Sequence, residues 1–224
     1  YDQLVSYADM DPFKVAAQQA GQTTAQNLSK FGYQEVSASR GESAYVWDEG
    51  DHYGAMVTEG LGTKNLVADA MRYVTGRTYY DNIAQDTVAM IVNDLVVVGA
   101  LPKVVTAHFS VGNSAWFNDE QRAQDLVNGW AAACNEAGAT WGGGETPTLK
   151  DILQPGVMEL SGSAVGEINP KERLTLGDKL QEGDHIILRG STGIHANGLT
   201  LAREIAESLR GGYETDIGSK TMYG

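Results

Sequence analysis

The chain has 224 residues, 42% of them hydrophobic, so it is long enough to bury the core of one large domain, and we do not expect it to be disordered. Its formal net charge of −13 argues against nucleic acid as a partner, because phosphate backbones are bound through basic surfaces. The single cysteine excludes an internal disulfide, and no signal peptide or membrane-spanning apolar run is found, so we expect a soluble, cytoplasmic protein.

The N-terminal part of the chain predicts one helix and one hairpin. Asp11-Pro12 is typical of a helix start, and the helix is expected to run to about Lys30. Two apolar runs, over 44–47 and 52–57, flank an acidic turn that contains a glycine. This pattern predicts two antiparallel strands.

The stretch Glu59-Gly60-Leu61-Gly62-Thr63-Lys64 follows the second strand and precedes a helix expected over 65–73. Glycines let backbone N–H groups approach phosphate oxygens, and a helix start adds partial positive charge. Lys64 would add a full charge, and Glu59 an oxygen for a divalent cation. The spacing matches neither the P-loop nor the Rossmann fingerprint, so a simple strand-to-helix turn with a solvated lysine is the alternative.

A largely apolar helix is predicted over 85–95. Asp86 and Asn93 are nearly two turns apart and project from one face, while Asp94 lies about 100° further round. Polar groups in an apolar helix need partners, which a metal or a phosphate–metal cluster would supply. The alternative is an N-cap acid at Asp86 and an Asn-Asp pair that bonds to neighbouring backbone.

Beyond this helix we predict a strand over 103–111 and a helix that ends at Gly138. Gly142-Gly143-Gly144 then lead to Glu145. The three glycines indicate backbone that approaches a ligand, with Glu145 directed at a cation, and a mobile loop is the alternative.

The last part of the chain predicts strands over 157–168 and 184–188 and a helix over 199–209. Between the second strand and the helix, hydrogen-bond donors gather and predict a second anion site: Ser191, Thr192, His195 and Asn197. We place the domain boundary after the first of these strands, giving an N-terminal domain of residues 1–168 and the beginning of a C-terminal domain over 169–224. The chain starts without methionine and stops soon after a helix, so we expect both ends to be cut.

Four stretches in this order resemble those of aminoimidazole ribonucleotide synthetase, also called phosphoribosylformylglycinamidine cyclo-ligase, of purine biosynthesis. They are Glu59-Gly-Leu-Gly-Thr-Lys64, Val92-Asn93-Asp94-Leu95, Gly143-Gly144-Glu145-Thr146 and Ser191-Thr-Gly-Ile-His195-Ala-Asn197-Gly198. The resemblance covers roughly residues 45–205. It extends more loosely to formylglycinamide ribonucleotide amidotransferase, selenophosphate synthetase, thiamine-monophosphate kinase and a hydrogenase maturation factor.

The resemblance implies an α/β (α+β) fold. In this family the mixed sheet of the N-terminal domain, with its flanking helices, pairs into a barrel across a homodimer, and a C-terminal α/β domain follows. It also implies a ligase that uses ATP and Mg²⁺ to close the imidazole ring of formylglycinamidine ribonucleotide, releasing ADP and phosphate. The implied partners are a second copy of the chain and a small ribonucleotide substrate, with no nucleic acid and no membrane.

The resemblance also implies roles for individual residues. Lys64 and Asp94 would be catalytic, and Glu59, Asp86, Asp94 and Glu145 would be linked to metal. ATP would contact Gly60, Gly62, Thr63, Lys64 and Asn93. The ribose phosphate of the substrate would be held by Ser191, His195, Asn197 and Gly198.

This sequence departs from the family pattern at several positions. Glu59 stands where the family has aspartate, and Ala107 where an aspartate is expected before His108. The stretch 37–43 replaces a glycine-rich segment, and Ile194 replaces a proline. We therefore expect a divergent member that is inactive as this chain alone, and two alternatives stay open: a related ATP-using enzyme with another substrate, and a non-catalytic nucleotide-binding dimer.

Overall fold

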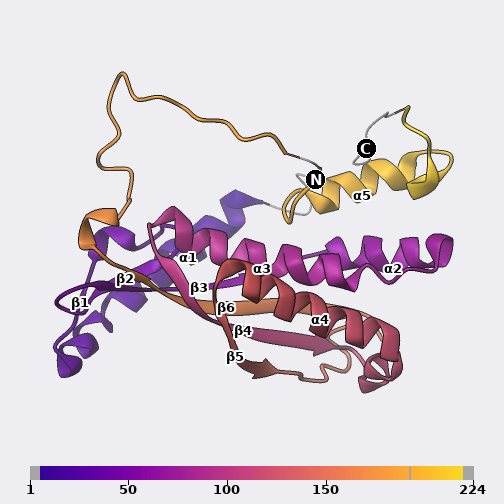
Figure 1. Ribbon diagram of the computed structural model, residues 1–224, viewed down its shortest axis with the longest axis horizontal. Helices are drawn as coiled ribbons and strands as arrows, with labels where there is room; N and C mark the ends of the chain where they lie inside the picture. The colour runs from indigo at the N-terminus through magenta and orange to yellow at the C-terminus, as the bar shows by residue number, and fades with distance from the viewer. Residues whose placement is uncertain (1–5, 192, 219–224) are drawn as a thin grey trace.

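A mixed six-stranded sheet carries the fold of the computed structural model, which describes residues 6–191 and 193–218 (Figure 1). The strand order is β1-β2-β3-β6-β4-β5; β4 and β5 run parallel, and the other neighbouring pairs run antiparallel. The strands are β1 (Gln34–Glu35), β2 (Tyr45–Asp48), β3 (Tyr53–Gly60), β4 (Leu101–Val111), β5 (Thr140–Glu145) and β6 (Met158–Ile168).

Helices cover one face of this sheet. Among the described residues, the α-helices are α1 (Tyr7–Gln22), α2 (Lys64–Thr75), α3 (Tyr80–Val97), α4 (Glu120–Ala137) and α5 (Leu199–Ser208). Short 3₁₀ turns lie at 25–31, 37–39, 114–118, 171–173 and 212–214. Helix α3 packs against the central strands β3, β4 and β6, and α4 packs against α3 and β5. Gly129 permits this helix contact, because a Cβ there would lie 2.6 Å from the Asp81 Cα. The expected mixed α/β fold with flanking helices is confirmed.

The hydrophobic core lies between the sheet and α3. Strand β6 alternates between buried and more exposed residues, so its buried side chains, such as Met158 and Leu160, face the helices. Helix α3 presents Ile83, Val88, Ile91 and Leu95 to the same layer, each at most 3% exposed. Tertiary burial therefore stabilises α3, which is apolar over most of its circumference.

The glycine-rich stretch before Glu145 is a strand, so the alternative of a mobile loop is wrong. It forms β5, in parallel register with β4, where Ala107 pairs with Gly144. A Cβ at Gly144 would lie 2.1 Å from the Ala107 carbonyl oxygen. Glycine is therefore required here by the neighbouring strand.

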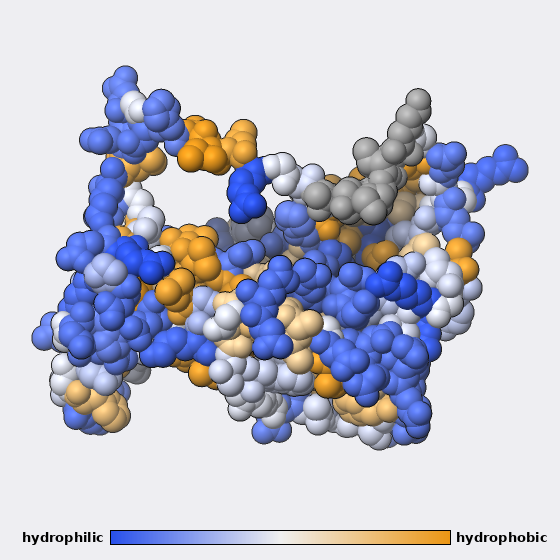
Figure 2. All heavy atoms as spheres, viewed as in Figure 1, coloured by the Kyte–Doolittle hydropathy of each residue, from blue (hydrophilic) through white to orange (hydrophobic). Residues whose placement is uncertain are grey.

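The predicted strand over 184–188 is also wrong. These residues pair with no strand among those that the structure describes, and Ile186, Ile187 and Leu188 are each at least 86% exposed. They belong to an extended connection between β6 and α5, along which apolar atoms are visible at the surface (Figure 2). A strand needs a hydrogen-bonded neighbour, and apolar composition alone does not provide one.

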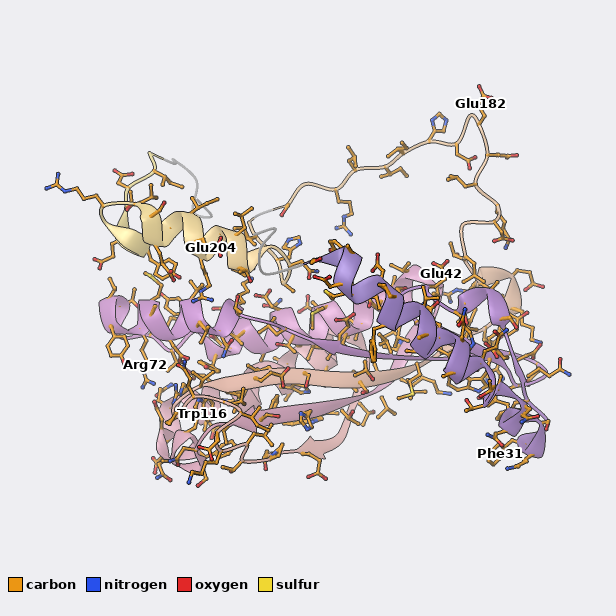
Figure 3. The ribbon with its side chains drawn as sticks, turned by 180° about the vertical axis from the view of Figure 1, so that it is seen from behind. Phe31, Glu42, Arg72, Trp116, Glu182 and Glu204 are labelled. Carbon is orange, nitrogen blue, oxygen red and sulfur yellow. The ribbon has the colours of Figure 1, made fainter. Side chains whose placement is uncertain are left out.

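The N-terminal helix begins earlier and ends sooner than predicted. Ser6 caps it through a bond from the Asp9 backbone N–H, and Pro12 lies inside the helix. The hydroxyls of Thr23 and Thr24 donate hydrogen bonds to carbonyls of the preceding turn. A 3₁₀ turn over 25–31 replaces the second half of the predicted helix, and it ends at Phe31, far from α2 (Figure 3). Within the described ranges, no helix is long and apolar enough to cross a membrane.

Candidate functional site

The glycine motif forms the turn between β3 and α2. Gly62 has a φ of +77°, which only glycine adopts freely, and Thr63 is the residue that precedes the helix. The hydroxyl oxygen of Thr63 is buried and has no hydrogen-bond partner in the described part of the chain. A buried hydroxyl without a partner at a helix start suits an anionic ligand that accepts its hydrogen bond.

Lys64 is the first residue of α2, and its ammonium contacts two distant segments. It forms an ion pair with Asp86 on α3, and it donates a hydrogen bond of 2.9 Å to the Ile194 carbonyl oxygen. The lysine thus lies between α3 and the loop that precedes α5.

A pair of carboxylates lies between the end of β3 and helix α3. Glu59 near the end of β3 faces Asp94 on α3, and the pKa of Glu59 is raised, first by burial and then by the hydrogen bond and negative charge of Asp94. Ser43 donates a 2.8 Å hydrogen bond to the Asp94 backbone oxygen, which fixes α3 against the segment before β2. Two acids that share a partly buried position favour a cation between them.

A cavity of about 320 Å³ lies between α3 and the loop before α5. Its polar lining comes from Asp86, Asn93 and Asp94 on one side and His195 and Asn197 on the other. The structure therefore brings together two motifs that are about a hundred residues apart in the sequence.

The loop itself is held by local bonds. The Ser191 hydroxyl donates to the Gly193 carbonyl oxygen at 2.6 Å and lies 3.2 Å from His195 Nε2. Gly198 has a φ of +83° and directly precedes α5. Thr192, the fourth predicted donor, lies outside the described residues.

The carboxylates do not form a complete metal cage. Within the described ranges, no group of three or more His, Cys, Asp or Glu side chains is arranged to hold a metal ion. Mg²⁺ does not require such a cage, because it commonly binds one or two carboxylates together with phosphate oxygens and water. The Glu59–Asp94 pair therefore fits Mg²⁺ in company with a phosphate ligand.

Glu145 lies apart from the other three predicted metal ligands. Its strand position pairs with His108, on the sheet face opposite the helices. Both residues line a separate cavity of about 530 Å³, together with hydroxyls of neighbouring strands. In this structure Glu145 is not near the Glu59–Asp94 pair.

Sequence reasoning missed Asn65, which follows Lys64. It is 1% exposed, and its side-chain amide donates to the Met158 carbonyl oxygen at 2.5 Å, so it fastens the first turn of α2 to the start of β6. Its place at the start of a predicted amphipathic helix carried no signal that it would be buried.

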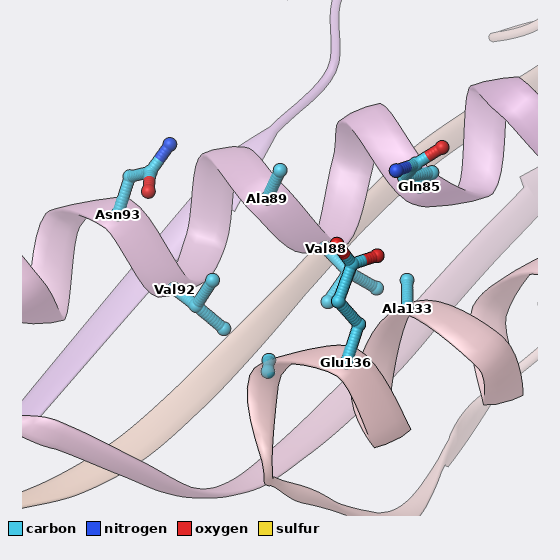
Figure 4. Close-up of a pocket in the computed structure, with 8 residues that line it drawn as sticks. Gln85, Val88, Ala89, Val92, Asn93, Ala133 and Glu136 are labelled. Atoms are coloured by element: carbon cyan, nitrogen blue, oxygen red, sulfur yellow. The ribbon is translucent and has the colours of Figure 1, made fainter.

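Asn93 also lines a second cavity, of about 200 Å³, between α3 and α4 (Figure 4). There the Glu136 side chain on α4 points toward Val88 on α3. Asn93 therefore lies between two cavities, and His195 lines one of them as well.

Comparisons with known proteins show which proteins this chain is similar to. Phosphoribosylformylglycinamidine cyclo-ligase of Pyrococcus furiosus is 36% identical over 165 residues, which cover 74% of this chain and 46% of that protein. The enzyme of the same name from Carboxydothermus hydrogenoformans is 42% identical over 147 residues, 66% of this chain and 40% of that protein. This chain thus spans less than half the length of these curated relatives.

Among solved structures, AaThiL complexed with AMPPCP and TMP overlaps with 57% of this chain and 36% of its own, at 14% identity and a TM-score of 0.46. Residues 41–168, more than half of the chain, match the family described as AIR synthase related protein, N-terminal domain. The chain therefore belongs to the AIR synthase related protein family and carries its N-terminal domain.

Proposed function

We propose that the chain carries the ATP- and Mg²⁺-binding part of a cyclo-ligase of purine biosynthesis, which closes the imidazole ring of formylglycinamidine ribonucleotide. The observation that carries the proposal is the cavity between α3 and the 191–198 loop, with Lys64 in contact with both. We also propose that residues 1–168 are the nucleotide-binding, dimerising domain and that 169–224 begin a second domain.

Each residue of the cavity would have a distinct task. Lys64, paired with Asp86, would neutralise phosphate charge, and Glu59 and Asp94 would hold Mg²⁺. When bound, ATP supplies the phosphoryl group that activates the amide oxygen of the substrate. His195 and Asn197 face the same cavity and can donate hydrogen bonds to a substrate phosphate.

A related ATP-using enzyme that acts on another small molecule is the second candidate. It is favoured by Glu145, which shares its cavity with His108 on the face away from Lys64. A different arrangement of acids around the substrate would suit a different reaction, while the residues proposed to bind ATP could stay the same.

The first test is calorimetric titration of ATP into the chain with and without Mg²⁺. We expect binding only with Mg²⁺, and we expect Asp94→Ala and Lys64→Ala to weaken it at least about tenfold, the effect of roughly 1.4 kcal/mol. Glu136→Ala is the control, because this carboxylate lines the other cavity of α3. Ring closure is then assayed with formylglycinamidine ribonucleotide.

Binding that is equally tight without Mg²⁺ and in both variants would contradict the assignment of this nucleotide site. Tight, metal-dependent ATP binding without ring closure would favour the second candidate.

A further inference from the structure

The sequence holds two Asn-Gly pairs, and the structure places them in opposite surroundings. Asn197-Gly198 lies in the loop before α5, where both residues are exposed. Asn128-Gly129 lies inside α4, where Gly129 is buried against α3. In an Asn-Gly pair the next backbone nitrogen can reach the side-chain amide easily, because glycine has no Cβ to shield that nitrogen.

We propose that Asn197 is a modification site, at which the side-chain amide is lost spontaneously and a carboxylate takes its place. The Gly198 backbone nitrogen attacks Asn197 Cγ, and ammonia leaves with the proton of that nitrogen, so that a succinimide ring forms. One water molecule then opens the ring at either of its carbonyl carbons. The products are aspartate and isoaspartate, in which the main chain runs through the side-chain carbon. No oxidant or reductant is consumed.

The groups that react are free of hydrogen bonds within the described part of the chain. Gly198 accepts the first helical bond of α5 through its carbonyl oxygen, with Ala202 as the donor, and its own N–H donates to no described residue. The side-chain hydrogen bonds described in this loop join Ser191 to Gly193 and His195, and Asn197 takes part in none of them. The Asn197 amide can therefore turn toward its own main chain.

The second pair is protected by its helix. Gly129 lies in the middle of α4, so its N–H donates to the carbonyl oxygen four residues earlier. The Asn128 side-chain oxygen accepts a 2.8 Å hydrogen bond from Gln124 Nε2, which holds the amide along the helix surface. Reaction at Asn128 therefore requires local opening of α4, which costs free energy that Asn197 does not have to supply.

The new charge would change the cavity between α3 and the loop before α5. Asn197 lines this cavity together with Asp86 and Asp94, so a carboxylate at position 197 adds a further acid to it. Negative charges at short range repel an anionic ligand. This consequence rests on the proposed function, which places a substrate phosphate at His195 and Asn197, whereas the modification itself does not.

The test incubates the 224-residue chain at pH 6 and at pH 8.5 and follows both pairs by peptide mass spectrometry. We expect Asn197 to lose its amide at least about tenfold faster than Asn128, because opening of a helix interior precedes the reaction at Asn128. The rate should rise with pH, since the attacking nitrogen must lose its proton, and the modified peptide should elute as two products of equal mass. In guanidinium chloride the two pairs should react at similar rates, which makes the unfolded chain the matched control.

The variant Asn197→Asp measures the effect of the added charge directly. In calorimetry we expect it to weaken the binding of formylglycinamidine ribonucleotide at least about tenfold. Asn128→Asp is its control, because it adds the same charge to the exposed surface of α4 and should leave the affinity unchanged.

The outcomes separate this inference from the proposed function. If Asn197 keeps its amide in the folded chain, or loses it no faster than Asn128, the modification site is overturned, whatever the chain binds. If Asn197 is faster by the same factor in guanidinium chloride, neighbouring residues and not the fold set the rate, and the inference is likewise overturned.

If Asn197 reacts as expected and the ribonucleotide does not bind the unmodified chain, the modification site stands and the proposed function fails. If Asn197→Asp binds the ribonucleotide as tightly as wild type does, the effect of the modification on the cavity is overturned.

Discussion

At the scale of single residues, Glu59 is the clearest case of a position that is unfavourable for folding and useful for binding. Burial raises the pKa of its carboxyl, and Asp94 raises it further. The folded chain therefore holds this proton more tightly than the unfolded chain does. The resulting stability is full below the ordinary carboxyl pKa and is lost as pH rises through the folded pKa.

Glu59→Gln should accordingly stabilise the chain at pH 7.5 in the absence of Mg²⁺, because the amide cannot ionise beside Asp94. We expect the Tm to rise by about 2 °C, a modest shift since solvent screens part of the repulsion. At pH 4 the two proteins should unfold at nearly the same temperature. Thermal unfolding followed by circular dichroism at both pH values measures this, and Glu136→Gln is the matched control. A lower Tm for Glu59→Gln at pH 7.5 would mean that the carboxylate pair is not repulsive.

At the scale of elements, the position of α2 depends on Arg122 of α4. Its guanidinium bonds to Asp69 on α2 at 3.1 Å and lies 4.3 Å from the centroid of the Trp116 ring. Arg72 on α2 donates a hydrogen bond to Asp119, which belongs to the same network. Arg72 and Trp116 lie at one end of the molecule (Figure 3). This network fixes the helix that begins with Lys64.

Arg122→Ala should lower the free energy of unfolding by about 2–3 kcal/mol, because it removes a charged hydrogen bond and the ion pair with Asp119, and leaves the Asp69 carboxylate partly buried without its cation. Arg77→Ala is the comparison, since its pair with Asp81 is exposed on both sides and should be worth less than about 0.5 kcal/mol. Urea unfolding of both variants gives the two values. Equal losses would show that the Arg122 network does not anchor α2.

Elements with strong local patterns could be predicted from the sequence, and those decided by neighbours could not. Helix α4 ends as expected, with Gly138 in the left-handed region at a φ of +69°. The glycines of β5 were misinterpreted because Gly144 is required by the close approach of the β4 backbone, and no local sequence pattern reveals that approach. Residues 184–188 were misinterpreted for the converse reason, since their composition is apolar but the described part of the chain offers them no partner strand.

At the scale of the whole molecule, the candidate site could be predicted only as separate pieces. The sequence indicates phosphate chemistry at Lys64 and hydrogen-bond donors near Ile194, but the two positions are 130 residues apart and meet only in the fold. Glu145 shows the limit of the same reasoning, because its motif matches the family pattern while its strand directs it to the other face of the sheet. Chain order therefore identifies the parts of this site, and sheet topology decides which of them meet.

That other face bears on the proposed homodimer. Met56, Val165 and Val104 pair in register across β3, β6 and β4, and each is between 38% and 43% exposed. They form an apolar stripe across the middle of a sheet face that α3 and α4 do not cover. An uncovered apolar stripe on central strands favours a second sheet as its cover.

Val165→Arg should therefore dissociate a dimer that forms through this face. Each dimer would bury two unpaired guanidinium groups, so we expect the dissociation constant to rise at least about a hundredfold. Val127→Arg is the control, because Val127 is 44% exposed on α4, away from the stripe. Sedimentation velocity at micromolar concentration should show a dimer for wild type and Val127→Arg and a monomer for Val165→Arg. A wild-type monomer, or a Val165→Arg variant that remains dimeric, would contradict a dimer formed through this sheet face. Any contribution of a second subunit to the Lys64 site would then need another interface.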